Sequence, residues 1–259
     1  MKKVYIALCI GLLCTAGCVC RPTDPDELAI FEQNNDPFEP TNRAIWEVNM
    51  FLDEYLLEPA AKGYRFIMPD FLKTGFTNFF DNLRQPVHLA NALLQGEGEA
   101  AWNIFKRLTT NTFIGFFGTI DVASEMEIQR SENDFGQTLA VWGFEEGGPY
   151  IVLPLFGPSN PRDAIGLGVD GLLTPADWVL ANQGQGWEYL YGKIAVDYVQ
   201  RREGNIEFYD SIKKGSTDFY ATTRSMYQQN RKNKIQKSIH GEAVVEQKQD
   251  YEFDFDIDE

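Results

Sequence analysis

The stretch NTFIGFFGTIDVA, residues 111–123, places five large apolar side chains within eight residues. In a helix, the 100° turn per residue would bring four of these side chains onto one face. They are Phe113, Phe116, Phe117 and Ile120. Gly115 and Gly118 would lie on the opposite face, where small residues let a neighbouring helix approach closely. The aromatic face needs cover from protein or from lipid, and a run this short fits a buried core helix as well as an interfacial one.

A second segment poses the same question. Residues 41–57 are expected to form a helix stopped by Pro59. Glu47 and Glu54 would share a narrow polar side, while apolar residues, Trp46 and Phe51 among them, cover most of the remaining circumference. A surface helix of a water-soluble protein normally shows a narrower apolar stripe. We therefore expect this helix to be enclosed on nearly every side.

The rest of the chain favours an all-α body of short amphipathic helices. Helix-start and helix-stop signals recur closely, for example at Pro86 and Gly96, and strand-like alternation is absent. One segment differs, because LAVW and YIVLPLF are separated by the glycine-rich loop GFEEGGP. This hairpin-like loop contains Gly143, Phe144, Gly147, Gly148 and Pro149. The arm that follows this loop, YIVLPLF, contains Pro154 and is therefore not expected to be a central strand, because proline lacks a backbone N–H.

The first residues predict a secretory signal peptide over 1–17, with a short basic start and an apolar run that is too short to span a bilayer. The residues Thr15-Ala16-Gly17-Cys18 resemble a bacterial lipobox, so we predict that Cys18 carries the lipid. An ordinary signal peptide is the alternative. Residues 18–35 are predicted to be a tether, and 36–235 the helical domain. All four cysteines lie within the first twenty residues, so the domain must be stable without disulfides.

The formal net charge is −15, and removal of Lys2 and Lys3 with the signal peptide leaves 21 basic residues against 38 acidic ones. This balance argues against nucleic acid as a partner and against attraction to anionic head groups. Residues 236–259 are expected to form a disordered acidic tail. No mature segment approaches the ~20 consecutive apolar residues of a spanning helix.

Catalytic and metal motifs are weak. The stretch GLGVDG, residues 166–171, matches a dinucleotide-binding pattern but lacks a strand before it. A serine-histidine-acid triad could use only His88, which lies on an apolar helix face. Two histidines and no cysteine in the domain leave a poor ligand set for zinc. We therefore expect no enzyme, no metal and no cofactor apart from the lipid on Cys18.

Several motifs in the same order resemble the MlaA lipoprotein family, also called VacJ. They are NDPFEPTNRAIWEVN, the stretch 51–123, FGQTLAVWGFEEGGPYIVLPLFGPSNPRDAIG and STDFYATTRSMYQQNR. The resemblance spans about residues 36 to 225. It implies a ring of helices lying in the periplasmic-side leaflet of the outer membrane, with a glycine-rich hairpin near an amphipathic channel. Glu145 and Glu146 stand where the family pattern leads us to expect a more apolar loop.

The family also implies a function and partners. Phospholipids misplaced in the outer leaflet would pass through the channel to a periplasmic carrier protein, beside a trimeric porin, and lipid asymmetry would be maintained. The residues then predicted to contact lipid are Trp46, Phe51, Phe113, Phe116, Phe117 and Ile120, with Gly115 and Gly118 packing helices together. A lipoprotein that only scaffolds porins is the main alternative, because exposed apolar faces also mark protein partners. A periplasmic lipid hydrolase is the weaker one.

Overall fold

The computed structural model describes residue 24 and residues 35–175 and 187–240. The predicted lipid-bearing Cys18, almost all of the tether and the tail after residue 240 lie outside the described residues. The helical domain of the sequence prediction ended at 235, but the last helix continues to His240.

The described residues form helices and one small hairpin. The elements are α3 (Glu39–Leu52), the π-helix η1 (Asp53–Leu57), α4 (Glu58–Ile67), α5 (Asp70–Gln95), α6 (Gly98–Phe113), α7 (Val122–Glu125), α8 (Phe135–Val141), β1 (Ile151–Leu153), β2 (Gly157–Ser159), α9 (Pro161–Leu173), α11 (Trp187–Gly204), α12 (Ile206–Gly215) and α13 (Phe219–His240). The all-α prediction is confirmed, with the hairpin as a minor addition.

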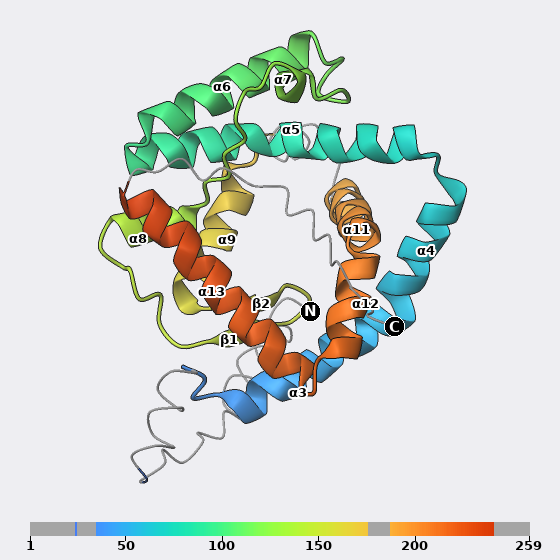
Figure 1. Ribbon diagram of the computed structural model, residues 1–259, viewed down its shortest axis with the longest axis vertical. Helices are drawn as coiled ribbons and strands as arrows, with labels where there is room; N and C mark the ends of the chain where they lie inside the picture. The colour runs from blue at the N-terminus through green and yellow to red at the C-terminus, as the bar shows by residue number, and fades with distance from the viewer. Residues whose placement is uncertain (1–23, 25–34, 176–186, 241–259) are drawn as a thin grey trace, which may run out of the picture.

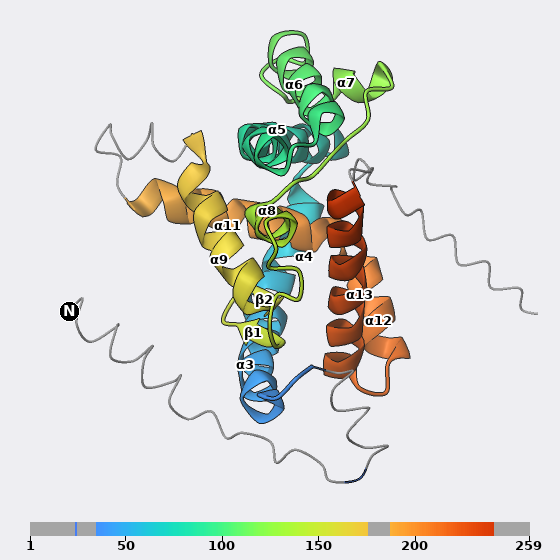
Figure 2. The same cartoon turned by 90° about the vertical axis from the view of Figure 1, so that its left-hand side faces the viewer.

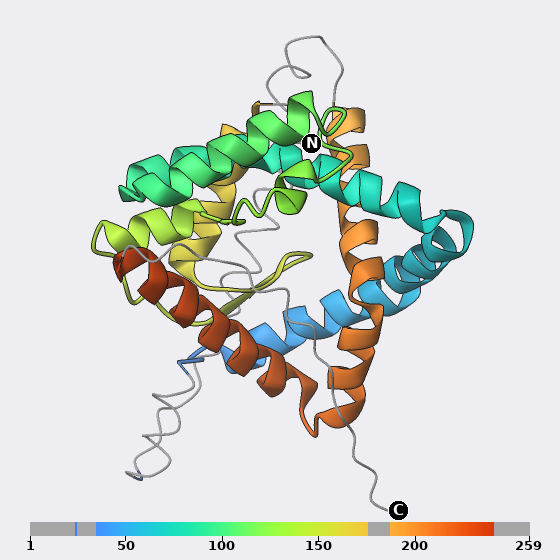
Figure 3. The same cartoon turned by 45° about the horizontal axis from the view of Figure 1, so that its top comes forward.

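The helices follow one another around the molecule, as the predicted ring requires (Figure 1). α3, α4 and α5 form three consecutive sides, and α13 lies along the remaining side. α6 packs along α5, and α11 lies inside the frame against α4 (Figures 1 and 3). In the perpendicular view, the β1–β2 hairpin lies between α13 and α9 (Figure 2).

Two prolines do not mark helix boundaries as the sequence suggested. Pro59 lies in the first turn of α4, so the helix predicted to stop there runs on through η1 to Ile67. Pro59 directly follows the π-helical turn η1, where the Glu58 N–H bonds the Asp53 carbonyl and the regular i to i−4 pattern is already interrupted. Pro86 lies inside α5, one 26-residue helix where two were predicted. Packing of α5 along α6 outweighs the local cost of that proline.

The hairpin also differs from the prediction. β1 and β2 are antiparallel with Val152 opposite Pro158. The first three residues of LAVW belong to α8, Trp142 is its C-cap, and the loop 143–149 leads from there towards β1. Two asparagines of α3 form hydrogen bonds with the backbone along the outer edge of β1. Asn42 accepts from the Val152 backbone N–H at 2.9 Å, and Asn49 donates to the Leu153 carbonyl at 3.0 Å. Their spacing of two helical turns matches the length of the strand.

Along the described residues, no helix has both the length and the apolar character that crossing a bilayer demands.

Candidate functional site

The aromatic residues of the opening stretch are exposed, but they do not form a helix. α6 ends at Phe113, and the chain then turns repeatedly through the loop 114–121. Phe113 is 83% exposed. The other large apolar side chains of this segment are also exposed: Ile114, Phe116, Phe117 and Ile120. The core alternative is therefore wrong for these side chains, and so is the helix predicted from about Asn111.

A left-handed backbone shapes this loop. Phe116 and Phe117 have φ values of 50° and 58°, which are rare for residues with a side chain, and Gly118 follows at 88°. Gly118 lies so close to α5 that an added Cβ would be 2.5 Å from the Asn82 Cβ. The predicted helix-packing role of Gly115 and Gly118 needs correction, since neither lies in a helix. Gly118 instead lets the loop rest on α5.

A buried arginine holds the base of the aromatic loop. Arg107 of α6 is 3% exposed and donates from Nη2 to both carboxylate oxygens of Asp121, at 2.8 and 2.7 Å. Asn111 donates to Asp121 at 2.9 Å and accepts from the Ala123 backbone N–H at 2.8 Å. Burial raises the pKa of Asp121, but hydrogen bonds from Ser124 and Asn111 and the charge of Arg107 outweigh it and keep that pKa low. The exposed rings thus project from a rigid, charged base.

Exposed apolar side chains continue along the other elements. On the helices they include Val48, Tyr55, Leu56, Phe66, Ile67, Phe71, Leu93, Trp102, Phe105, Ile165 and Leu172, and between α8 and β2 they include Trp142, Phe144, Leu155 and Phe156. Scattered single residues of this kind are ordinary on a soluble protein, but an extended set marks a surface covered by lipid or protein.

The two aromatic residues predicted on the first helix have different environments. Phe51 is 59% exposed and packs its ring against Tyr55 at 4.7 Å between centroids. Trp46 is only 8% exposed and packs with Tyr150, Val152 and Tyr220. The prediction that Trp46 contacts lipid is wrong, because that side of α3 faces the hairpin and α13.

The interior between the helices is polar. Asn133 donates to Gln95 at 2.7 Å and to Glu97 at 2.8 Å, and Gln95 donates to Thr138 at 2.9 Å. Asn91 extends this network towards α9, because it accepts from Thr138 and donates to Asp170. Asn91 and the four residues named before it are all buried. Among the described residues, buried polar side chains outnumber buried apolar ones. An apolar exterior around a polar interior reverses the usual pattern of a water-soluble protein.

Sequence reasoning missed this polar interior, although a signal existed. Asn103, Arg107 and Asn111 recur every four residues and lie buried along one side of α6. Trp102 and Phe105 of the same helix are exposed. Amide and charged side chains at helical spacing form a polar stripe, and aromatic residues lie on the opposite side. This pattern indicates a helix whose polar face is buried and whose apolar face is exposed.

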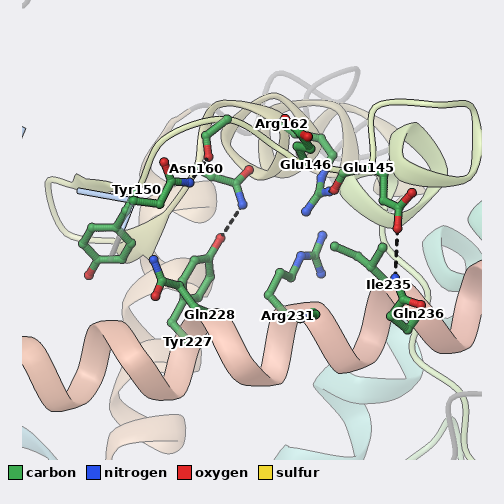
Figure 4. Close-up of a pocket in the computed structure, with 13 residues that line it drawn as sticks. Glu145, Glu146, Tyr150, Asn160, Arg162, Tyr227, Gln228, Arg231, Ile235 and Gln236 are labelled. Atoms are coloured by element: carbon green, nitrogen blue, oxygen red, sulfur yellow. Dashed lines mark hydrogen bonds between the residues drawn. The ribbon is translucent and has the colours of Figure 1, made fainter. Parts of the chain in front are cut away.

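A polar cavity of about 520 Å³ lies between α13 and the loop 143–149 (Figure 4). Tyr227 and Arg231 point from α13 towards Asn160, Arg162 and Glu145 on the opposite wall. Tyr227 donates to Asp163 at 2.6 Å and accepts from Asn160 at 3.0 Å. These contacts join α13 to the start of α9.

Backbone contacts hold the glycine-rich loop against this cavity. Arg162 donates from Nη1 to the carbonyl of Glu145 at 2.6 Å, and its backbone N–H donates to the carbonyl of Gly147 at 3.2 Å. Gly147 and Gly148 have φ values of 71° and 88°, a region that favours glycine. The Glu145 side chain accepts from Gln236 of α13 at 2.9 Å. Of the other predicted loop residues, Phe144 is exposed, and Gly143 and Pro149 mark the two ends.

Other sequence motifs have structural roles. Residues 166–171 lie inside α9, so the GLGVDG stretch forms a helix and no phosphate-binding loop. His88 places Nδ1 2.8 Å from the carbonyl oxygen of Asn133. Within the described ranges, no group of three or more histidine, cysteine or acidic side chains is arranged to hold a metal ion.

The fold and the site define a class of protein: a helical frame with an apolar exterior and a polar interior, suited to contact with lipid. Comparison with known proteins identifies the particular family. Residues 34–234 match the MlaA lipoprotein family, and the chain belongs to that family.

Individual relatives support this membership. The chain is 32% identical over 251 residues to the intermembrane phospholipid transport system lipoprotein MlaA of Haemophilus influenzae, covering 95% of this chain and 94% of the relative. It is 31% identical over 231 residues to the protein of that name in Escherichia coli, covering 88% and 86%. A structure solved in work on the structural basis for maintenance of bacterial outer membrane lipid asymmetry is also similar. It superposes with a TM-score of 0.67 at 30% identity, covering 77% of this chain and 98% of that one.

Proposed function

We propose that this protein is an outer-membrane lipoprotein of a phospholipid transport system. It takes phospholipids misplaced in the outer leaflet and delivers them towards the periplasm, which maintains lipid asymmetry. Its closely similar relatives are named for intermembrane phospholipid transport, and the similar solved structure concerns outer-membrane lipid asymmetry. No covalent chemistry is part of this role.

The observation that carries the proposal is the reversal of apolar and polar residues. Phe51, Phe113 and Phe117 are exposed, while Gln95, Asn103 and Arg107 are buried. Exposing aromatic rings to water is unfavourable, and acyl chains remove that cost. A polar interior suits a charged head group, because moving a charge through an apolar medium has a high free-energy cost. The proposal is thus a frame that lies in the periplasmic-side leaflet and offers head groups a polar route through its centre.

Anchoring would combine two contributions. A lipid on Cys18 gives only limited membrane affinity by itself, and buried apolar area supplies the rest. The net charge of −15 is compatible with this mode because it needs no attraction to anionic head groups.

The proposed partners are phospholipids as cargo, a periplasmic lipid-carrier protein that receives them, and a trimeric porin beside the frame. Exposed apolar patches bind proteins as well as lipid, so the apolar helices are the surface proposed to contact the porin.

The test is the phospholipid content of the outer leaflet in a strain lacking this protein. We expect it to rise on deletion and to fall when the intact protein is re-expressed, but not when the Cys18→Ser variant is. An unchanged outer leaflet in the deletion strain, together with association of the intact protein with porin in the parent strain, would favour the scaffold over the transporter.

A further inference from the structure

The cavity between α13 and the loop 143–149 carries an inference that rests on the proposed function. Most of its thirteen lining residues are polar or charged, and Tyr150, Tyr227 and Ile235 are the large apolar contributors. A volume of about 520 Å³ is within the usual range of small-molecule sites. The polar and charged side chains among the lining residues suit a phospholipid head group.

The two arginines that line the cavity are already committed to other groups. Arg231 contacts the carboxylates of Asp134 and Asp163 through all three guanidinium nitrogens. Arg162 contacts Asp163 and the loop carbonyls. They therefore position the walls and leave little donor capacity for a ligand.

Two other charged side chains at the cavity have no partner among the described residues. Lys232 projects from α13, and Glu146 belongs to the loop on the facing wall. Both are exposed, and neither forms an ion pair or a hydrogen bond with another residue of the described ranges. Tyr150 also lines the cavity, but its ring packs in the core against Trp46 and Tyr220, and its buried hydroxyl points away from the other lining side chains (Figure 4).

Apolar side chains beside the cavity offer contacts for the acyl chains of a lipid, in addition to the contacts for its head group. Phe144 is next to Glu145 in the chain, and its ring is exposed, as is that of Trp142. The loop thus offers apolar side chains directly beside the charged mouth.

From these features we infer that the cavity binds a zwitterionic phosphoethanolamine head group. Lys232 contacts the phosphate, and Glu146 accepts hydrogen bonds from the primary ammonium. A choline head group lacks those N–H donors, and a phosphoglycerol head group lacks the positive charge. The site therefore discriminates among phospholipids by the chemistry of the amine.

The test is calorimetric titration of the purified full-length protein in detergent. The probes are glycerophosphoethanolamine, glycerophosphocholine, glycerophosphoglycerol and inorganic phosphate. We expect the first to bind at least about tenfold more tightly than the others, because only it can form both charge-assisted contacts. Glu146→Gln and Lys232→Gln should each weaken this binding by about tenfold or more.

Matched controls are Glu47→Gln on α3 and Lys214→Gln on α12, both exposed and outside the cavity. They should leave the affinity unchanged, and thermal melts should show that all four variants fold. Equal binding of all probes, phosphate binding alone, or equal effects of cavity and control variants would overturn the inference. Each of these results would leave the proposed transport function standing, since that function is tested separately by the outer-leaflet lipid of the deletion strain.

Discussion

Arg231 of α13 and Asp134 at the start of α8 form a doubly bonded ion pair, with Nη1 2.6 Å from Oδ2 and Nη2 2.7 Å from Oδ1. Asp134 is the N-cap of α8 and accepts from the Gln137 backbone N–H at 2.9 Å. The same guanidinium lies 2.8 Å from Asp163 of α9. One side chain of the last helix therefore fixes two elements that precede it by many residues.

Replacing Arg231 with glutamine should lower the free energy of unfolding by about 2–4 kcal/mol. The change leaves Asp163, which is largely buried, and the half-buried Asp134 without their cation. Chemical denaturation in detergent measures the effect. Lys237→Gln, an exposed change on the same helix, should alter stability by less than about 0.5 kcal/mol. Similar losses for both variants would contradict the structural role of Arg231.

The same pair should make stability fall in acid. Burial raises the pKa of Asp134, but the hydrogen bond and charge of Arg231 outweigh it and hold that pKa below its usual value. Its contribution is then present above the unfolded pKa of about 3.9 and lost as pH falls through the lower folded value. The stability curves of the wild type and Arg231→Gln should converge as the pH drops below 4, and a constant gap there would argue against this linkage.

Glu97 should show the opposite dependence. Burial raises its pKa, despite the hydrogen bond from Asn133, and its Oε1 has no partner. The folded state is therefore penalised as pH rises through the unfolded pKa of about 4.3 and on through the higher folded value. Glu97→Gln should stabilise the protein at pH 7 and have little effect at pH 4, in melts run at both values. Equal effects at the two values would show that the carboxylate is not strained.

Gly118→Ala should destabilise the aromatic loop. The alanine would need a φ near 88°, and its Cβ would overlap with Asn82. We expect a loss of at least about 2 kcal/mol. Gly168→Ala is the control, because that glycine lies inside α9 with no neighbour within 4 Å and should gain about 0.5–1 kcal/mol. If both changes were neutral in thermal unfolding, the loop would not depend on Gly118.

The same loop shows what periodicity can and cannot predict. A helical wheel grouped Phe113, Phe116 and Phe117 on one face, and all three are exposed, but so is Ile114, which lies off that face. It assumed a helix that the chain does not form after Phe113. The left-handed turn depends on a contact between Gly118 and Asn82, which is distant in sequence. Periodicity carries no information about such a contact.

Tertiary packing explains the other differences. Pro86 reads as a helix start, but α6 packs along α5 and keeps it continuous. Trp46 and Phe51 have similar apolar surroundings in sequence, and only the position of the hairpin determines which of them is buried. The helical class and the family motifs were predictable because both depend on local patterns.

Replacing Phe113, Phe116 and Phe117 with serine should release an unlipidated form of the protein from membranes. Each exposed ring that inserts into lipid contributes about 1.5 kcal/mol or more, so partitioning should weaken roughly tenfold per ring. Vesicle flotation measures this. The matching triple leucine variant keeps the loop apolar and should remain bound. Unchanged flotation of the serine variant, with its fold intact, would show that the loop does not contact lipid.

Trp46→Ala and Phe51→Ala should separate stability from membrane binding on a single helix. The buried Trp46 packs edge-to-face on Phe219 and Tyr220, at 5.3 and 6.0 Å between centroids. Its loss should cost about 3–5 kcal/mol in unfolding free energy, because the cavity left between α3, the hairpin and α13 cannot close. Phe51 is exposed, so its loss should change stability by less than about 1 kcal/mol and weaken vesicle flotation instead. The reverse outcome, with a stable Trp46→Ala variant that fails to float, would mean that the indole faces lipid after all.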